Sequence, residues 1–393
     1  MDITLTDAEK EHCTALHIEI AREITSRNGW IPFSRYMEMA LYQPGKGYYS
    51  AGSHKLGVGG DFTTAPEISP FFGITITNTI LPILQKLRAN GVPTRILEFG
   101  AGTGKLAESI LNRLRELDFP LDHYDIIEIS PDLAQRQSHH LEIAQEQNGW
   151  NTQLNWLTSL PNAFQGVVIA NEVLDAIPCD LIIFKDGEWR WQGVTVTNGV
   201  LSWKTGTTVD RQQLPEYLLE YHAFADGYLT EIHPQANAWM TSLCQAVDCG
   251  LLLAFDYGFP DSEYYHPQRL QGTLMAHHRH HTITDPFHLP GLCDLTSHVE
   301  WSTIARSALS AGIDDVFLSN QAAYLLDAGI GEVVLEKADP TNPNAFLPIS
   351  NALQKLLSEA EMGELFKVFA CSKNLAHPCL SDLPGLNGRN RFG

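Results

Sequence analysis

The sequence predicts an α/β fold with a doubly wound, mostly parallel sheet, and three observations predict it. Short apolar stretches alternate with stretches of helical periodicity from about residue 91 onward, as in parallel strands joined by crossover helices. A glycine-rich turn stands between the first of these strands and the first helix. The chain has 393 residues, 44% of them hydrophobic, which is enough for a large core domain with additions.

The part before this alternation is predicted to be helical with an irregular middle. Apolar residues recur at intervals of four within residues 6–28, and Asn28-Gly29 ends that predicted helix. A segment rich in turn residues and aromatics follows, and such segments carry function more often than core. Helical periodicity returns over residues 72–90 and ends at Gly91.

The next part carries the alternation of strands and helices. Apolar runs of about five residues predict strands, and the longer amphipathic runs between them predict helices. The predicted strands are 95–99, 124–129, 154–157 and 166–170, and the predicted helices are 105–117 and 133–148.

The alternation is interrupted after residue 180. Residues 181–204 alternate in period two around Asn198-Gly199, which predicts a β-hairpin insertion. Residues 260–300 are rich in His, Pro and Gly and are predicted to form a long functional loop. The remaining predicted elements are a helix over 234–247, a strand over 251–255, a helix over 301–311, a strand over 316–318, a mostly helical part over 321–362, a last strand over 365–371 and a loose tail after 374.

The charge balance argues against a nucleic-acid partner. Lys and Arg total 26 against 46 Asp and Glu, which gives a net charge of −20. That sign does not suit a surface that must neutralise phosphates. A cationic partner suits the negative electrostatic field of this chain better, although an acidic surface also serves solubility.

The compartment signals predict a cytoplasmic protein. The seven cysteines are scattered and form no C-x-x-C pair, which favours a reducing compartment. The start, MDITLTDAEKEH, has neither the apolar core of a signal peptide nor the Arg- and Ser-rich pattern of a transit segment. No apolar run approaches the roughly 20 residues that span a membrane. We therefore expect a soluble cytoplasmic protein without a membrane span.

The glycine turn is the strongest motif, because its spacing separates three ligand classes. A phosphate-binding Walker A loop needs a glycine at Phe99 and Ser or Thr at Leu106, and a dinucleotide loop needs G-x-G-x-x-G. The spacing here is E-x-G-x-G-x-G over residues 98–104, which resembles motif I of class I S-adenosylmethionine (SAM) methyltransferases. Glu128 ends the second strand, where a carboxylate can accept hydrogen bonds from a ribose diol.

The strand over 166–170 is followed by Asn171, Glu172 and Asp175. Ligands of doubly wound sheets bind outside the carboxyl ends of the strands, so these side chains are expected to face the methyl group. Amino-methylases of nucleic acids place Asn or Asp, two prolines and an aromatic at this point, and this chain does not.

The chain resembles the MidA-like methyltransferase family over most of residues 30–300. Ordered agreement of this many blocks is not expected by chance. Thr158 departs from the pattern, because an acid often follows the third strand, and within residues 277–281 only His280 matches a family histidine. The matching blocks are residues 33–37, 40–42, 47–49, 60–62, 64–69, 97–106, 171–176, 256–258, 272–274 and 294–299.

This resemblance implies an α/β class I SAM methyltransferase, with a Rossmann-like core, an N-terminal helical cap and α/β insertions, and SAM as its cofactor. The expected domains are a helical and loop cap over the cofactor site (1–90), the SAM-binding core (91–180 and 231–260), a β-hairpin insertion (181–230), an active-site loop region (261–300), C-terminal helices and last strands that complete the core (301–375) and a flexible tail (376–393).

Two sets of site residues are expected. Glu172, with Asp175 second, would pair with a guanidinium and direct its free nitrogen toward the methyl group, and His280 could accept a proton. The alternative for Glu172 is that it only orders a loop. The alternative for Asp175 is that it is an acid at a helix start, and the alternative for His280 is that it is an exposed loop histidine. Adjacent histidines lack metal-ligand spacing, so no metal is expected. The expected cofactor-binding residues are Glu98, Gly100, Gly102, Gly104, Glu128, Asn171, Thr64 and Pro66, the last two as a lid.

The resemblance also bears on the acceptor, because the mitochondrial family member dimethylates an arginine in a subunit of respiratory complex I. We therefore expect a protein substrate that presents an arginine, with a respiratory-complex subunit as one candidate, no nucleic acid, and a homodimer left open. Two alternatives remain: a methyltransferase for a small molecule or another side chain, and a SAM-binding assembly protein without turnover.

Overall fold

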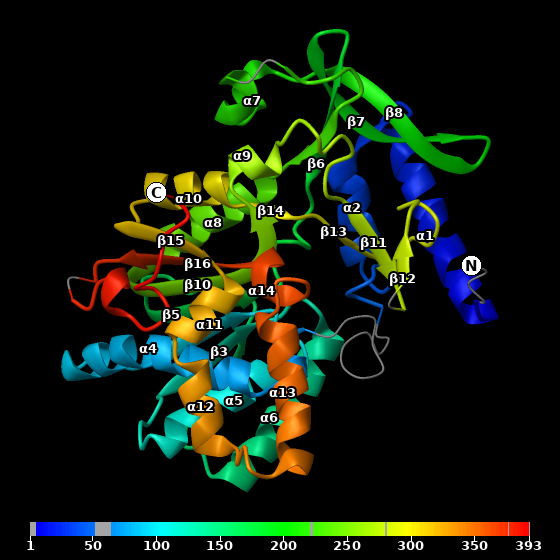
Figure 1. Ribbon diagram of the computed structural model, residues 1–393. Coiled ribbons are helices and arrows are strands. Elements are labelled where there is room, and N and C mark those ends of the chain that lie inside the picture. Colours follow the sequence, from blue (N-terminus) through cyan, green and yellow to red (C-terminus); the bar gives the residue numbers. More distant parts are fainter. Residues whose placement is uncertain (1–4, 52–63, 221–222, 280, 376, 393) are drawn as a thin grey trace. The chain divides into compact units, whose positions relative to one another are not determined.

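The computed structural model of the chain describes residues 5–51, 64–220, 223–279, 281–375 and 377–392 (Figure 1). The chain folds into two units, each assembled from three segments. Unit 1 comprises Met1–His54, Leu174–Ala238 and Phe259–Thr303, and unit 2 comprises Lys55–Val173, Trp239–Gly258 and Ile304–Gly393.

Unit 2 is built on a mostly parallel sheet with the strand order β15-β16-β10-β5-β2-β3-β4. β16 is antiparallel to β10 and β15, and the other neighbours are parallel. The winding reverses between β2 and β5, which is where open α/β sheets bind ligands, and this order confirms the predicted fold class. The strands are β2 (Arg95–Phe99), β3 (His123–Ile127), β4 (Gln153–Leu157), β5 (Phe164–Asn171), β10 (Val247–Phe259), β15 (Asp315–Asn320) and β16 (Phe366–Lys373).

Helices pack on both faces of this sheet. Figure 1 shows α8 and α10, which begin in unit 1 and end in unit 2, on one side of β10, β16 and β15, and α4, α5 and α11 on the other. Gly73 lets α4 approach α5, because a Cβ at Gly73 would lie 1.9 Å from Oγ of Ser109. The helices are α3 (Ala65–Ile68), α4 (Phe71–Ala89), α5 (Lys105–Glu116), α6 (Pro131–Asn148), α8 (Pro234–Ala246), α10 (Trp301–Ser310), α11 (Gln321–Asp327), α12 (Ile330–Lys337), α13 (Pro343–Leu357) and α14 (Met362–Leu365).

Unit 1 contains two smaller antiparallel sheets, β1-β7-β6-β9 with β8 paired to β7, and β12-β11-β13. Asn198 and Gly199 have φ of +52° and +79° between β7 and β8, as a two-residue hairpin turn requires, so the predicted hairpin is present. The elements are α1 (Asp7–Ser26), β1 (Ile31–Pro32), α2 (Phe33–Tyr42), β6 (Asp180–Lys185), β7 (Glu188–Thr197), β8 (Val200–Thr208), α7 (Glu216–Glu220), β9 (Leu229–Ile232), α9 (Asp261–Tyr264), β11 (Met275–His278), β12 (His281–Ile283), β13 (Asp294–Thr296) and β14 (Val299–Glu300).

The region 260–300, predicted to be a long loop, instead contains α9 and the sheet of β11, β12 and β13. Glu231 in β9 anchors it, because the fully buried carboxylate accepts hydrogen bonds from the N–H groups of Thr273 (2.8 Å) and Leu274 (2.9 Å) and from the Tyr264 hydroxyl (3.0 Å). Strands of three or four residues are too short for a period-two pattern to stand out, so the prediction was wrong here.

The tail after residue 374, predicted to be loose and flexible, is packed onto unit 2. Leu380, Leu383 and Leu386 are buried in its hydrophobic core, and Asn390 makes two 3.0 Å hydrogen bonds with the backbone of β15. Leu380 begins a short helical turn over Leu380–Asp382, and Leu383 and Leu386 follow that turn. The domain division given above stays a prediction.

Candidate cofactor and active site

The glycine loop joins β2 to α5. Gly100, Gly102 and Gly104 have φ of +59°, +56° and +88°, a backbone region that residues with a Cβ rarely adopt. The N–H of Gly100 donates a 3.0 Å hydrogen bond to the carbonyl of Ile127, which ties the loop to the end of β3. The loop is therefore a tight bend at a helix N-terminus, where backbone N–H groups point outward and favour a carboxylate or phosphate.

Glu128 directly follows β3. Its half-buried carboxylate accepts hydrogen bonds from the N–H of Ser130 (2.9 Å) and from Nε2 of Gln137 (2.9 Å). Burial raises the pKa of this carboxyl, and the hydrogen bonds oppose part of that rise. The neighbouring Ile129 is 68% exposed, which puts an apolar surface beside the acid. The two side chains together suit a ligand that has hydroxyl groups and an apolar ring.

Glu98, the first residue of the motif, is an interior group. Its side chain accepts a 2.7 Å hydrogen bond from the hydroxyl of Tyr124, and the residue is 2% exposed. Burial raises the pKa of Glu98 to about 7. The carboxyl joins β2 to β3 inside unit 2, and its direct contact with a cofactor stays a prediction.

Thr64 and Pro66 begin the short helix α3, and the residue after them contacts the glycine loop. The Thr64 carbonyl accepts a 2.9 Å hydrogen bond from the N–H of Glu67, and Pro66 suits the first turn because its missing N–H has no helical partner there. Glu67 accepts a hydrogen bond from the Thr103 hydroxyl and pairs with Nζ of Lys105 at 2.5 Å. Sequence reasoning missed Glu67, whose signal was its place in the 64–69 block.

Asn171 ends β5, and Glu172 follows it with φ of +54°. The N–H of Glu172 donates a 2.8 Å hydrogen bond to the carbonyl of Phe255 in β10, and Nδ2 of Asn171 donates one of 3.2 Å to Oε1 of Glu172. A left-handed conformation costs a residue with a Cβ roughly 1 kcal/mol, and such strain gathers at functional sites. The neighbouring residues Asn171 and Glu172 therefore stand at the carboxyl edge of the sheet, hydrogen-bonded to each other.

Asp175 follows Glu172 by three residues, at the start of the second segment of unit 1. Asp175 lies in unit 1, is 5% exposed, and accepts a 3.0 Å hydrogen bond at its backbone carbonyl from the N–H of Ser297. In the same unit the hydroxyl of Tyr49 donates to the carboxylate of Asp294 at 3.0 Å, and burial followed by nearby acids, Asp294 first, raises the pKa of Tyr49. His280 lies outside the described residues.

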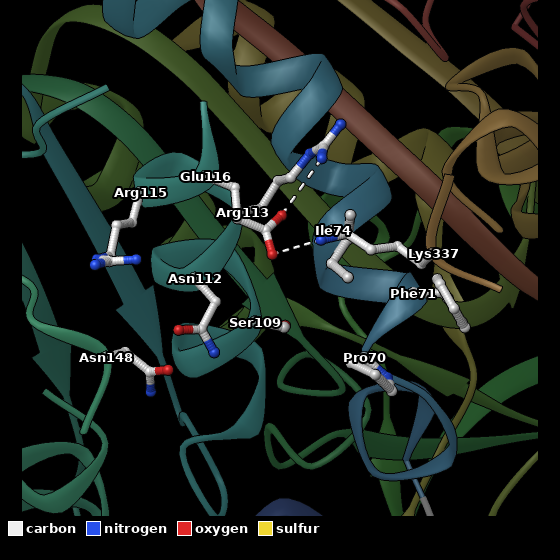
Figure 2. Close-up of a pocket in the computed structure, with 10 residues that line it drawn as sticks. All are labelled: Pro70, Phe71, Ile74, Ser109, Asn112, Arg113, Arg115, Glu116, Asn148 and Lys337. Atoms are coloured by element: carbon white, nitrogen blue, oxygen red, sulfur yellow. Dashed lines mark hydrogen bonds and ion pairs between the residues drawn. The ribbon is translucent and has the colours of Figure 1, made fainter. Parts of the chain in front are cut away.

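Unit 2 also has a pocket of about 330 Å³ between α4, α5, α6 and α12 (Figure 2). Figure 2 shows the Glu116 carboxylate directed at Arg113 and Lys337, and the ion-pair distances are 3.4 and 2.5 Å. Arg113 also pairs with Glu336 at 2.7 Å. Arg113 and Lys337 are therefore paired with acids, and none of the predicted site residues lines this pocket.

The described ranges contain neither a metal-ligand cluster nor a membrane-spanning helix. No group of three or more His, Cys, Asp or Glu side chains there is arranged to hold a metal ion. No helix in that part of the chain is long and apolar enough to cross a membrane.

Comparisons with known proteins agree on one family. Residues 75–316, more than half of the chain, match the family described as "Putative S-adenosyl-L-methionine-dependent methyltransferase". A Burkholderia thailandensis protein crystallised with S-adenosyl-homocysteine (SAH) is 41% identical, with a TM-score of 0.90 over 99% of this chain and 98% of that chain. A native crystal structure of a protein from the same organism, also 41% identical, gives a TM-score of 0.88.

Curated relatives carry a more specific name. The Drosophila melanogaster "Protein arginine methyltransferase NDUFAF7 homolog, mitochondrial" is 26% identical over 90% of this chain and 85% of its own length, and the Homo sapiens protein is 26% identical over 87% and 80%. Their mitochondrial label contradicts the cytoplasmic location expected from the sequence, so that expectation was wrong. On the family match and the 41% identity, the chain is a SAM-dependent methyltransferase and belongs to the MidA-like family.

Proposed function

We propose that this methyltransferase transfers methyl groups to an arginine side chain of a protein. The observation that carries the proposal is the name of its relatives: those from Drosophila melanogaster, Danio rerio and Homo sapiens are named protein arginine methyltransferases, and each aligns with 87% or more of this chain. The net charge of −20 supports a cationic acceptor. The family resemblance suggests a respiratory-complex subunit as the protein that presents the arginine.

The described residues fit the family's cofactor. Glu128 has acceptor sites left for ribose hydroxyls, Ile129 offers an apolar face for adenine, and the N–H groups of the glycine loop suit the methionine carboxylate. Bound SAM supplies a methyl group on a positively charged sulfur, which makes that carbon electrophilic. We assign the remaining cofactor contacts to Glu98, Thr64, Pro66 and Asn171.

In this proposal Glu172 is the principal acid for the acceptor. A guanidinium has a pKa above about 12, so the nitrogen that receives the methyl group must also lose a proton. The Glu172 carboxylate accepts hydrogen bonds from the guanidinium, orients its plane and favours that proton loss, with Asp175 as the second acid. His280 is proposed as a further proton acceptor.

The substitution Glu172→Gln separates cofactor binding from transfer. We expect SAH affinity to stay within about twofold of the unsubstituted protein, while the transfer rate falls roughly 100-fold or more, because a positioned charge at the reacting group is lost. Calorimetry measures the affinity. Labelled SAM added to a cell lysate, followed by mass spectrometry, measures the rate and locates the modified residue. Full activity would remove Glu172 from the mechanism, and label on residues other than arginine would overturn the proposed acceptor.

The substitution Gly102→Val tests the cofactor loop. Gly102 has φ of +56°, which a β-branched residue avoids, and a side chain there would occupy the space of the bound cofactor. We expect calorimetry with SAH to detect no binding. Thermal unfolding of the ligand-free variant serves as the control for folding, and unchanged affinity in a folded variant would contradict the assignment of the loop.

A further inference from the structure

Gln137 in α6 links three segments of unit 2. The side chain is fully buried, and its Nε2 donates to the carbonyl of Gly102 at 3.0 Å and to Oε2 of Glu128 at 2.9 Å. Its Oε1 accepts a 3.0 Å hydrogen bond from Nε1 of Trp156 in β4. One amide therefore joins the glycine loop, the end of β3 and the next strand along the sheet.

The chemistry of the partners fixes which way this amide faces. The indole N–H of Trp156 can only donate, so Oε1 of Gln137 must face it. The carbonyl of Gly102 and the carboxylate of Glu128 can only accept, so the two hydrogens on Nε2 must face them. Each hydrogen of the amide nitrogen thus has one acceptor, and no other common side chain of this length supplies two donors and one acceptor in a plane.

We propose that Gln137 is a positioning residue that holds the Glu128 carboxylate and the glycine loop in the arrangement that grips the cofactor. This inference rests on the proposed role of Glu128 in binding the ribose. Ser130 fixes Oε1 of Glu128 through its N–H at 2.9 Å, and Gln137 fixes Oε2. A carboxylate has about four acceptor sites, so the Glu128 carboxylate keeps capacity for a cis-diol while Ser130 and Gln137 hold its two oxygens in a defined direction.

The alternative is that Gln137 only fills space in the core. An apolar side chain of the same length would then serve as well as the amide. A positioning role makes a different prediction, because a carboxyl here would stand about as close to Glu128 as Nε2 does, and its proton would decide whether the contact attracts or repels.

The test compares Gln137→Met and Gln137→Glu by calorimetry with SAH between pH 7.5 and 9. We expect Gln137→Met to bind SAH about tenfold or more weakly, because a hydrogen bond to a charged group is lost. We expect the affinity of Gln137→Glu to fall as the pH rises, by up to about tenfold per pH unit, because the pair loses a shared proton and the two carboxylates repel. The unsubstituted protein gives the reference profile, which includes the titration of the SAH amino group.

Other titratable groups nearby do not explain such a slope. Burial raises the pKa of Glu98 on β2 to about 7 and raises that of Tyr124 on β3, and both groups are present in every protein compared, so their titration cancels in the comparison. Gln135→Glu is the matched control, because it introduces the same charge on the exposed face of α6. Its affinity and pH profile should match those of the unsubstituted protein.

Different outcomes decide the positioning role of Gln137 and the ribose contact of Glu128. Thermal unfolding without ligand identifies a variant that fails to fold, and the pH slope of Gln137→Glu is then read from whichever pH values keep it folded. Unchanged SAH affinity in Gln137→Met, or a Gln137→Glu profile parallel to that of Gln135→Glu, overturns the positioning role. Unchanged affinity in Glu128→Gln instead overturns the ribose contact, and with it the proposed site. Weak binding in Glu128→Gln with normal binding in both Gln137 variants overturns only the present inference.

Discussion

Glu98 holds its carboxyl inside unit 2 against the hydroxyl of Tyr124, and this makes stability depend on pH. Its pKa is about 7 in the folded protein against 4.5 as a reference, so between these values the folded state binds the extra proton. The free energy of unfolding therefore falls as the pH rises through this window, by at most about 3 kcal/mol. In Glu98→Gln this contribution disappears, while the amide oxygen still accepts from Tyr124.

Urea unfolding of the ligand-free protein at pH 5 and pH 8 measures this effect. Raising the pH from 5 to 8 should lower the unfolding free energy more in the unsubstituted protein than in Glu98→Gln. The other titrating groups are the same in both proteins, so their contributions cancel in the comparison. Equal pH dependence in the two proteins would mean that Glu98 does not hold a proton in the folded state.

Single residues were predictable where spacing alone defines them. The glycines of the loop and Glu128 are found from their intervals along a strand, turn and helix pattern, without knowledge of the fold. Gln137, Glu67 and Glu231 were not found, because each is one polar residue with a partner that lies 35 or more positions away in the chain. Their importance depends on contacts, and only the folded structure supplies those.

Among the secondary-structure elements, α3 is held in place by side chains of the glycine loop and of the start of α5. Glu67 is 6% exposed at its side chain and pairs with Lys105 at 2.5 Å, and it also accepts from Thr103. In Glu67→Ala we expect α3 to detach more often, so the amides of Glu67 and Ile68 should exchange hydrogen several-fold faster. Mass-spectrometric exchange measures this, and Glu263→Ala on the exposed part of α9 is the control. Unchanged exchange would show that the side-chain contacts do not hold α3.

Element prediction succeeded where apolar periodicity extended over enough residues. The helices near 105–117 and 133–148 and the strand Arg95–Phe99 were predicted within a few residues of α5, α6 and β2. The short strands β11, β12 and β13 were missed, because three or four residues are too few to show a distinct period. A distant buried acid, Glu231, also holds the segment that leads into β11.

At the scale of the whole molecule, the proposed cofactor contacts all belong to unit 2, although the chain enters that unit three times. Ligand binding stabilises only the states that can hold the ligand, by about 2.7 kcal/mol at 100 times the dissociation constant. Openings that break the glycine loop, α3 or the Glu128 turn should therefore become roughly 100-fold rarer with SAH. Local openings at the end of the β7 and β8 hairpin in unit 1 do not release the ligand and should be unaffected.

Hydrogen exchange with and without saturating SAH tests this division. Slower exchange is expected for backbone amides that donate a hydrogen bond to a carbonyl or a carboxylate inside the proposed site. These amides belong to Gly100, Gly104, Ser130 and Glu67. Amides near the Asn198-Gly199 turn should exchange at the same rate in both samples. The Gly102→Val variant provides the control, because SAH should then slow neither set. Equal slowing of both sets in the unsubstituted protein would mean that the cofactor stabilises unit 1 as much as unit 2, and the assignment of the cofactor contacts to unit 2 alone would be wrong.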